Sequence, residues 1–109
     1  MVKTYNKLVR DNIPEIIKEA GREPTYEYIT DEKKFEAALR MKLVEEAQEV
    51  SSARDRKELI EELADIFEVC SELMALYKIP SQLVIDEAFY KAKEKGRFSK
   101  RIFLKEVKK

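Results

Sequence analysis

Five carboxylates recur on two segments of the chain that both show helical periodicity. The first segment contributes Glu45, Glu46 and Glu49, and the second contributes Glu62 and Asp65. At about 100° per residue, Glu46 falls inside the apolar stripe of its helix, whereas Glu45 and Glu49 step away along one flank. A purely solvated charged face would lie opposite the stripe. The position of these acids, more than their number, therefore indicates a site.

The two acidic segments belong to two long helices, expected over residues 31 to 50 and 55 to 77. The apolar stripe of the first is Phe35, Leu39, Leu43, Ala47 and Val50. The stripe of the second is Leu59, Ile60, Leu63, Ile66, Phe67, Cys70, Leu73, Met74 and Tyr77. Glu62 borders this second stripe, and Asp65 lies one step further round, on a flank that also carries Val69 and Leu76.

A polar break over residues 51 to 58 predicts a short turn between the two helices, which makes them antiparallel. The five carboxylates would then face one another at a partly apolar site. Like charges held together in a low dielectric either raise their pKa values or bind a cation. The chain has no histidine, and its single cysteine, Cys70, lies in the apolar stripe. An oxygen-only ligand set suits a hard ion such as Mg²⁺ or Mn²⁺.

A bound Mg²⁺ typically completes its shell with substrate phosphates, so the implied chemistry is on a phosphate ester or anhydride. The competing interpretation is a solvated acidic face. Lys42 and Arg54 stand at helical spacing from several of the acids and could pair with them. Spacing alone supports both interpretations equally, and the place of Glu46 in the stripe favours the site.

Shorter elements flank the long helices. A first helix is expected over residues 12 to 20, with Asn12 as its cap, and residues 25 to 30 read as an extended loop whose Thr30 caps the next helix. A fourth helix should run from residue 80 or 81 to Gly96. Its expected buried side is Val84, Ile85, Ala88, Phe89 and Ala92. The chain is thus predicted to be one all-α domain over residues 1–109, a helical bundle with two long antiparallel helices.

Composition narrows the partners. The 22 basic and 22 acidic residues cancel, which argues against an extended nucleic-acid interface. No apolar run approaches the roughly 18 residues of a membrane span, and the N-terminus lacks the apolar core of a signal peptide, so we expect a cytoplasmic protein. A helical chain of 109 residues with apolar surface on both long helices favours a homodimer or a dimer of dimers.

Three blocks of the sequence carry a family resemblance. EEAQE and ELAD, separated by twelve residues, have the form E-E-x-x-E then E-x-x-D. This pattern resembles the magnesium-binding signature of the all-α nucleoside triphosphate pyrophosphohydrolases, which include MazG-like proteins and phosphoribosyl-ATP pyrophosphohydrolases. YNKLVRDNIPEII and KAKEKGRFSKRIFL are similar to the opening and closing segments of a phosphoribosyl-ATP pyrophosphohydrolase-like subgroup. The resemblance implies that the metal-site residues are Glu45, Glu46, Glu49, Glu62 and Asp65.

The resemblance also implies a reaction: hydrolysis of a nucleoside triphosphate between the α and β phosphorus atoms, which gives a monophosphate and pyrophosphate. Mg²⁺ is the expected cofactor, with Mn²⁺ as an alternative. Glu46 or Glu49 would orient or deprotonate the attacking water. The candidates for substrate binding are Lys7, Arg10, Asp11, Lys91, Lys95 and Arg97, although Asp11 could instead cap the first helix.

Three functions remain open on the sequence. The first is a Mg²⁺-dependent nucleotide pyrophosphohydrolase of the house-cleaning kind, which removes noncanonical or surplus nucleoside triphosphates. The second is a phosphoribosyl-ATP pyrophosphohydrolase of histidine biosynthesis, which would share the motif and the chemistry. The third is a non-catalytic helical dimerisation or regulatory module whose acids only solubilise it. The place of Glu46 inside the apolar stripe argues against the third.

Overall fold

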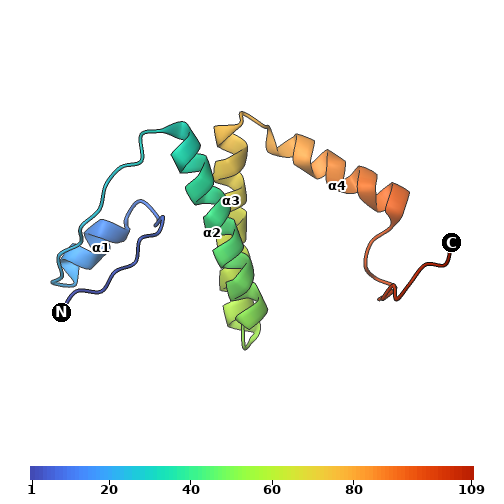
Figure 1. Ribbon diagram of the computed structural model, residues 1–109, viewed down its shortest axis with the longest axis horizontal. Helices are drawn as coiled ribbons and strands as arrows, with labels where there is room; N and C mark the ends of the chain where they lie inside the picture. The colour runs from blue at the N-terminus through green and yellow to red at the C-terminus, as the bar shows by residue number, and fades with distance from the viewer.

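The chain forms four α-helices and no strands in a computed structural model, which describes all 109 residues. The helices are α1 (Ile13–Glu19), α2 (Glu32–Ser52), α3 (Arg56–Leu76) and α4 (Ser81–Lys95) (Figure 1). The prediction of an all-α chain with two long helices is confirmed, and the expected ends of every helix lie within two residues of the observed ends.

An antiparallel hairpin of α2 and α3 forms the centre of the molecule (Figure 1). Only residues 53–55 connect the two helices, and Asp55 begins α3 by accepting a hydrogen bond of 2.8 Å from the backbone amide of Glu58. Such a cap satisfies an amide that has no partner inside the helix. The interface between α2 and α3 is the only extensive one between helices, and it holds the three buried residues of the chain, Leu39, Glu46 and Val69.

The α2 helix uses the face that the sequence predicts. Leu39 and Glu46 are buried on it, and Phe35, Leu43 and Val50 are half-buried. Ala47, which was expected in the same stripe, is exposed, and this part of the prediction is wrong. The hairpin therefore encloses one acidic side chain within an otherwise apolar strip.

The α3 helix packs on α2 through one edge of its predicted apolar stripe and the flank beside it. Val69 is buried, and Leu76 and the stripe residues Ile66, Cys70, Leu73 and Met74 are half-buried, whereas the stripe residues Leu59, Ile60, Leu63, Phe67 and Tyr77 are exposed. Apolar residues cover too much of the α3 circumference for one neighbouring helix to contact them all. The flank that carries Glu62, Asp65 and Val69 is the one that meets α2.

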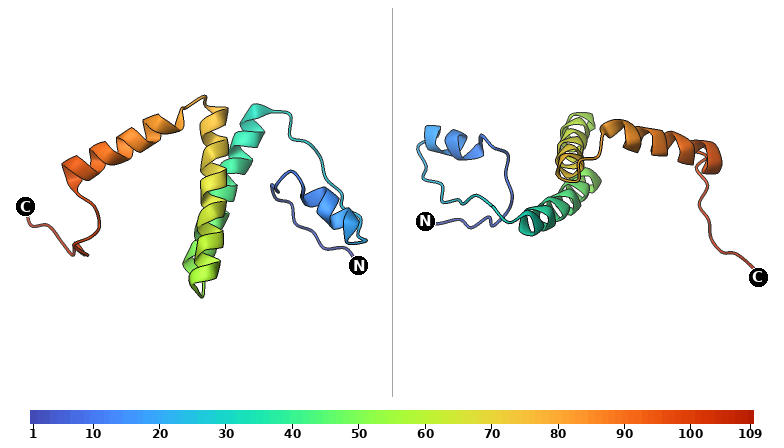
Figure 2. Two further views of the ribbon diagram at one scale, coloured as in Figure 1. Left: turned by 180° about the vertical axis from the view of Figure 1, so that it is seen from behind. Right: turned by 90° about the horizontal axis from the view of Figure 1, so that it is seen from above.

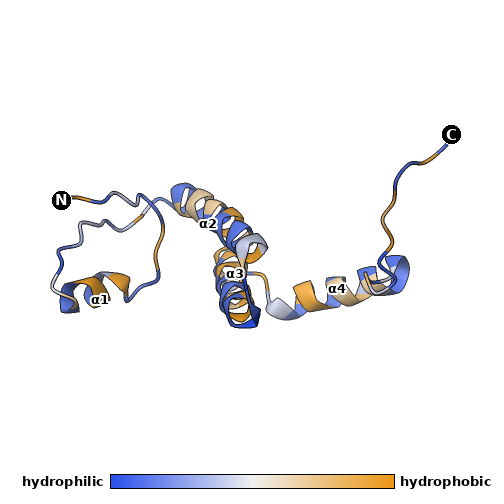
Figure 3. Cartoon of the chain, turned by 90° about the horizontal axis from the view of Figure 1, so that it is seen from below, coloured by the Kyte–Doolittle hydropathy of each residue, from blue (hydrophilic) through white to orange (hydrophobic).

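The helices α1 and α4 lie on opposite sides of the hairpin (Figure 2). The radius of gyration is 18.5 Å, whereas a compact chain of this length has about 13 Å. No element of the chain covers α4, so the predicted burial of Val84, Ile85, Ala88 and Phe89 is wrong for the protomer, and only Ala92 is half-buried. Figure 3 shows the apolar turns of α4 standing clear of the hairpin.

Two predicted helix caps are also wrong. Asn12 already has helical backbone angles, with φ −90° and ψ −1°, and its side chain caps nothing. Asp31 rather than Thr30 caps α2, because its extended backbone lets the carboxylate accept a hydrogen bond of 2.9 Å from the amide of Lys33. Residues 25–30 form the expected extended loop. None of the four helices has both the length and the apolar composition that crossing a membrane demands.

The hairpin core makes a direct prediction about stability. Leu39 is 2% exposed, so Leu39→Ala removes packed methyl groups and should lower the free energy of unfolding by about 2–5 kcal/mol. Met41 on the same helix is 68% exposed and points away from the hairpin interface, so Met41→Ala is the matched control, expected to change stability by about 0.5 kcal/mol or less. Urea unfolding followed by circular dichroism measures both. Equal losses in the two variants would contradict the assigned core.

Candidate metal centre

Three carboxylates from the two long helices converge at the hairpin interface. Glu46 comes from α2, and Glu62 and Asp65 come from α3; each offers one oxygen such that the three oxygens lie within 4.8 Å of one another. Residues three apart on a helix share a face, which places Glu62 and Asp65 together. The antiparallel partner brings Glu46 opposite them. Three of the five predicted metal-site residues thus meet.

Glu46 occupies the most enclosed position of the group. It is 6% exposed, whereas Glu62 and Asp65 are half-buried. The Nζ atom of Lys42, one turn earlier on α2, lies 3.4 Å from Glu46 Oε1, and the Lys42 side chain is 18% exposed. A buried carboxylate without such a partner would cost several kcal/mol of desolvation. Lys42 therefore offsets part of the charge that the fold encloses.

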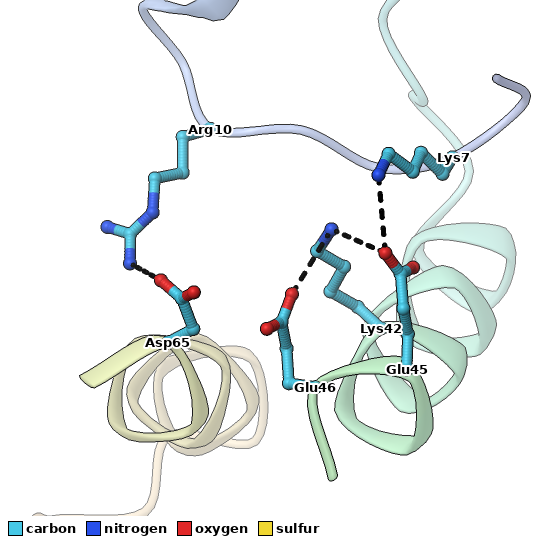
Figure 4. A network of polar contacts seen from close by, with 6 residues as sticks. All are labelled: Lys7, Arg10, Lys42, Glu45, Glu46 and Asp65. Carbon is cyan, nitrogen blue, oxygen red and sulfur yellow. Dashed lines mark hydrogen bonds and ion pairs between the residues drawn. The ribbon is translucent and has the colours of Figure 1, made fainter. Parts of the chain in front are cut away.

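Glu45 is bound by two lysines. Lys42 and Lys7 donate hydrogen bonds of 3.4 and 3.3 Å to the same oxygen, Oε1 (Figure 4). Burial raises the pKa of Glu45, but the positive charge of Lys42 and the contacts from Lys7 outweigh it and hold the pKa below its ordinary value. Glu45 is therefore ionised and lies outside the group of three. Its role as a metal ligand stays a prediction.

Asp65 forms an ion pair with an arginine near the N-terminus, 55 residues earlier in the sequence. Arg10 Nη2 donates a hydrogen bond of 2.7 Å to Asp65 Oδ1, and this bond raises the pKa of Arg10 above its ordinary value (Figure 4). Lys7 and Arg10 both belong to the N-terminal segment, residues 1–12, which passes over α2 and α3. Direct pairing of Arg10 with a metal-site acid was not predicted, because nothing in the sequence spacing relates residues so far apart.

No basic side chain pairs with Glu62 or Glu49. Burial raises the pKa of Glu62, and the negative charges of Glu49, Asp65 and Glu46 raise it further. Glu49 is exposed beside this group and acts on it through its charge. Its assignment as a ligand or base stays a prediction. The acidic cluster is therefore neutralised on one side and strained by repulsion on the other.

The donor set fits a hard divalent cation. Only carboxylate oxygens converge, they are partly shielded from water, and repulsion disfavours the ionised form of Glu62. Mg²⁺ and Mn²⁺ prefer such ligands over nitrogen or sulfur donors. Glu46, Glu62 and Asp65 are the residues that would hold the ion.

The predicted substrate-binding residues separate into two groups. Lys7 and Arg10 lie at the acidic cluster, and Asp11 is exposed just before α1. Lys91, Lys95 and Arg97 lie on or directly after α4, which does not pack against the hairpin, so the protomer does not bring them to the cluster. Lys42 was not predicted as a site residue, only as a partner of the acids on a solvated face. Its spacing from Glu45 and Glu46 is the signal that could have identified it.

A family model described as phosphoribosyl-ATP pyrophosphohydrolase matches residues 7–91, which is most of the chain and includes both acidic motifs. The match confirms the resemblance to the MazG-like all-α pyrophosphohydrolases, a superfamily that depends on metal in general. Within that superfamily the chain belongs to the phosphoribosyl-ATP pyrophosphohydrolase family. No curated protein and no solved structure gives a significant match.

Burial and like-charge repulsion at Glu62 predict a gain in stability when its charge is removed. A raised pKa means that the folded state favours the protonated form, so ionisation costs stability as the pH rises from the ordinary value of 4.5 through the raised one. Glu62→Gln should therefore raise the melting temperature at pH 7 with the metal chelated by EDTA. The gain should shrink near pH 4, where wild-type Glu62 becomes protonated in both states.

Glu61→Gln is the matched control for this measurement, because Glu61 is an exposed neighbour outside the cluster. Its melting temperature should follow the wild type across the pH range. A Glu62→Gln protein that melts at or below the wild-type temperature at pH 7 would show that the cluster carries no uncompensated charge.

Proposed function

We propose that this protein is a Mg²⁺-dependent nucleotide pyrophosphohydrolase that cleaves nucleoside triphosphates between the α and β phosphorus atoms, in a house-cleaning role. The observation that carries the proposal is the convergence of the buried Glu46 with Glu62 and Asp65 at the hairpin interface. Membership of the family supports the class of reaction. A merely solvated acidic face would not place one of its carboxylates in the core.

The acids of the cluster have two roles in the proposed reaction, binding the ion and activating water. Glu46, Glu62 and Asp65 hold the divalent ion, which when bound offsets the charge that develops on the phosphate oxygens. Glu49 is exposed, has no basic partner and stands beside Glu62, so it is the better candidate to orient or deprotonate the attacking water. Glu46 is the weaker one, because it is enclosed and paired with Lys42.

Two basic residues at the edge of the acidic cluster, Lys7 and Arg10, can bind the phosphate chain. The side chains of Lys7 and Arg10 are 42% and 57% exposed, so both can reach a ligand in solvent. Arginine and lysine both bind phosphate oxygens, the former through a planar fork of donors. These two residues are the substrate-binding groups that the protomer itself supplies.

A second candidate function is phosphoribosyl-ATP pyrophosphohydrolysis in histidine biosynthesis. The description of the matching family favours it, and the bond broken is of the same type. The acidic cluster supports both functions equally, since an ion held by these carboxylates would act on the phosphates and not on the base. A panel that contains phosphoribosyl-ATP beside canonical and modified nucleoside triphosphates separates the two by their relative kcat/KM.

We also propose that the protein is a homodimer or a dimer of dimers. Three buried residues are too few to stabilise a chain of 109 residues. The unpartnered apolar faces of α3, around Phe67, and of α4, around Phe89, occur together in every copy, so self-association can cover both. Lys91 and Lys95 would bind substrate at the acidic cluster only if assembly brings α4 of another copy close to it.

The reaction makes a direct prediction about products. Initial hydrolysis should release a nucleoside monophosphate and pyrophosphate together, with no diphosphate intermediate, and should require Mg²⁺ or Mn²⁺. Asp65→Asn and Glu46→Gln keep the side-chain volume and remove one charge, so each should lower kcat/KM by about 100-fold or more. Chromatography of early time points measures both quantities. Diphosphate and orthophosphate as first products would refute the assignment.

The proposed assembly is tested by light scattering coupled to size-exclusion chromatography. Wild-type protein at micromolar concentration should have the mass of a dimer or tetramer. Phe67→Glu introduces a charge into the exposed apolar face of α3 and should shift the mass toward the monomer, whereas Met41→Glu, on an exposed position of α2, should not. A wild-type monomer of 12.9 kDa would contradict the proposal.

A further inference from the structure

Two charged contacts hold the N-terminal segment over the acidic cluster. Lys7 donates to Glu45 on α2, and Arg10 donates to Asp65 on α3, so the segment is fixed to both helices of the hairpin (Figure 4). Only one other side-chain hydrogen bond joins distant parts of the chain, from Arg40 to Tyr77. These two ion pairs are thus the side-chain hydrogen bonds that join the N-terminal segment to the hairpin.

The two ion pairs differ in what metal binding does to them. Asp65 is one of the three residues that converge to hold an ion, whereas Glu45 is not. A divalent ion on Asp65 would take up the negative charge that attracts Arg10 and would add positive charge beside the guanidinium. The negative charge of Glu46, which also attracts Arg10, would be offset at the same time. The contact between Lys7 and Glu45 lies outside this exchange.

We propose that Arg10 is a counter-ion that the metal displaces from Asp65, and that the released guanidinium then binds the phosphate chain of the substrate. The contact between Lys7 and Glu45 keeps the segment within reach during the exchange. The first half concerns the metal alone, and the second half rests on the proposed function. Arg10 thus makes phosphate binding conditional on a filled metal site.

The exposure of the ion pair suits a contact that must be replaced. The side chains of Arg10 and Asp65 are 57% and 36% exposed, so water screens their attraction. An exposed ion pair of this kind lowers the affinity for a competing divalent ion by only about two- to fivefold. Arg10 can therefore neutralise Asp65 in the absence of metal and still yield to a divalent ion.

Metal affinity gives the first test, with Mn²⁺ alone as the probe and free Mn²⁺ measured by electron paramagnetic resonance. Arg10→Ala removes the competitor and should tighten binding by about two- to fivefold. Lys3→Ala is the matched control, because Lys3 carries the same charge in the same segment but contacts only the ring of Tyr5. It should leave the Kd unchanged. Equal Kd values for wild type and Arg10→Ala, or equal tightening in Lys3→Ala, would overturn the displacement.

Segment mobility gives the second test. The chain contains no tryptophan, so Val9→Trp places a single fluorophore directly beside Arg10 and beyond the Lys7 contact, where Val9 is 39% exposed. Its anisotropy should fall when Mg²⁺ is added and recover when inorganic pyrophosphate joins the Mg²⁺. With Arg10→Ala also present, the anisotropy should be low throughout. An anisotropy that Mg²⁺ leaves unchanged would refute the displacement, and one that pyrophosphate does not restore would refute phosphate capture.

The failures of the two proposals are distinguishable. Wild-type protein that binds no Mn²⁺ would overturn the proposed function together with this inference. Wild-type protein that binds Mn²⁺ and hydrolyses nucleotides, while Arg10→Ala changes neither the Kd nor the anisotropy, would overturn this inference alone.

Discussion

A carboxylate enclosed between two helices must be balanced by positive charge, and this constraint shapes the whole molecule. Glu46 is 6% exposed at the interface of α2 and α3, close to two further acids. Uncompensated, such a charge would cost several kcal/mol, a large fraction of the stability of a small domain. The fold answers with Lys42 one turn away on the same helix. It also draws the N-terminal segment across the hairpin, where Lys7 and Arg10 neutralise neighbouring acids.

Positive charge compensates only some of the acids in the cluster. Three acids have basic partners: Glu45 pairs with Lys42 and Lys7, Glu46 with Lys42, and Asp65 with Arg10. No basic side chain forms an ion pair with Glu62 or Glu49. Burial and the negative charges of Glu49, Asp65 and Glu46 therefore act together on Glu62 and raise its pKa. A divalent ion would relieve that repulsion, and in the proposed reaction it would also offset the charge of the phosphate chain. The acids that repel one another in the hairpin are thus the ones that would bind the ion.

Local signals in the sequence predicted most of the fold. Helical periodicity and the glycines gave the helix ends to within two residues, although the caps Asn12 and Thr30 were wrong, and the place of Glu46 in the α2 stripe pointed to the cluster. Both signals depend on residues within a few turns of one another. The packing face of α3 was predicted only in part, since Ile66 and Leu73 lie at it but the centre of the predicted stripe does not. Its stripe through Leu59 and Phe67 shows that a face is apolar, but it does not show which partner covers that face.

The same limit explains the remaining errors. The apolar side of α4 was correctly recognised as a pattern, yet no element of the protomer lies against it. The pairing of Arg10 with Asp65 joins residues far apart in the chain, and only the course of the N-terminal segment brings them together. Lys42 was visible from its spacing, but its burial became evident only once α2 and α3 were placed side by side.

The central claim is that Glu46, Glu62 and Asp65 together hold one divalent ion. Anomalous diffraction from a crystal grown in saturating Mn²⁺ tests it most directly, because manganese is located without reference to the protein atoms. The account predicts an anomalous peak bounded by carboxylate oxygens of these three residues at ligand distances of about 2.1 Å, as for Mg²⁺. A well-ordered hairpin with no peak at this position, or with the ion bound elsewhere, would contradict it.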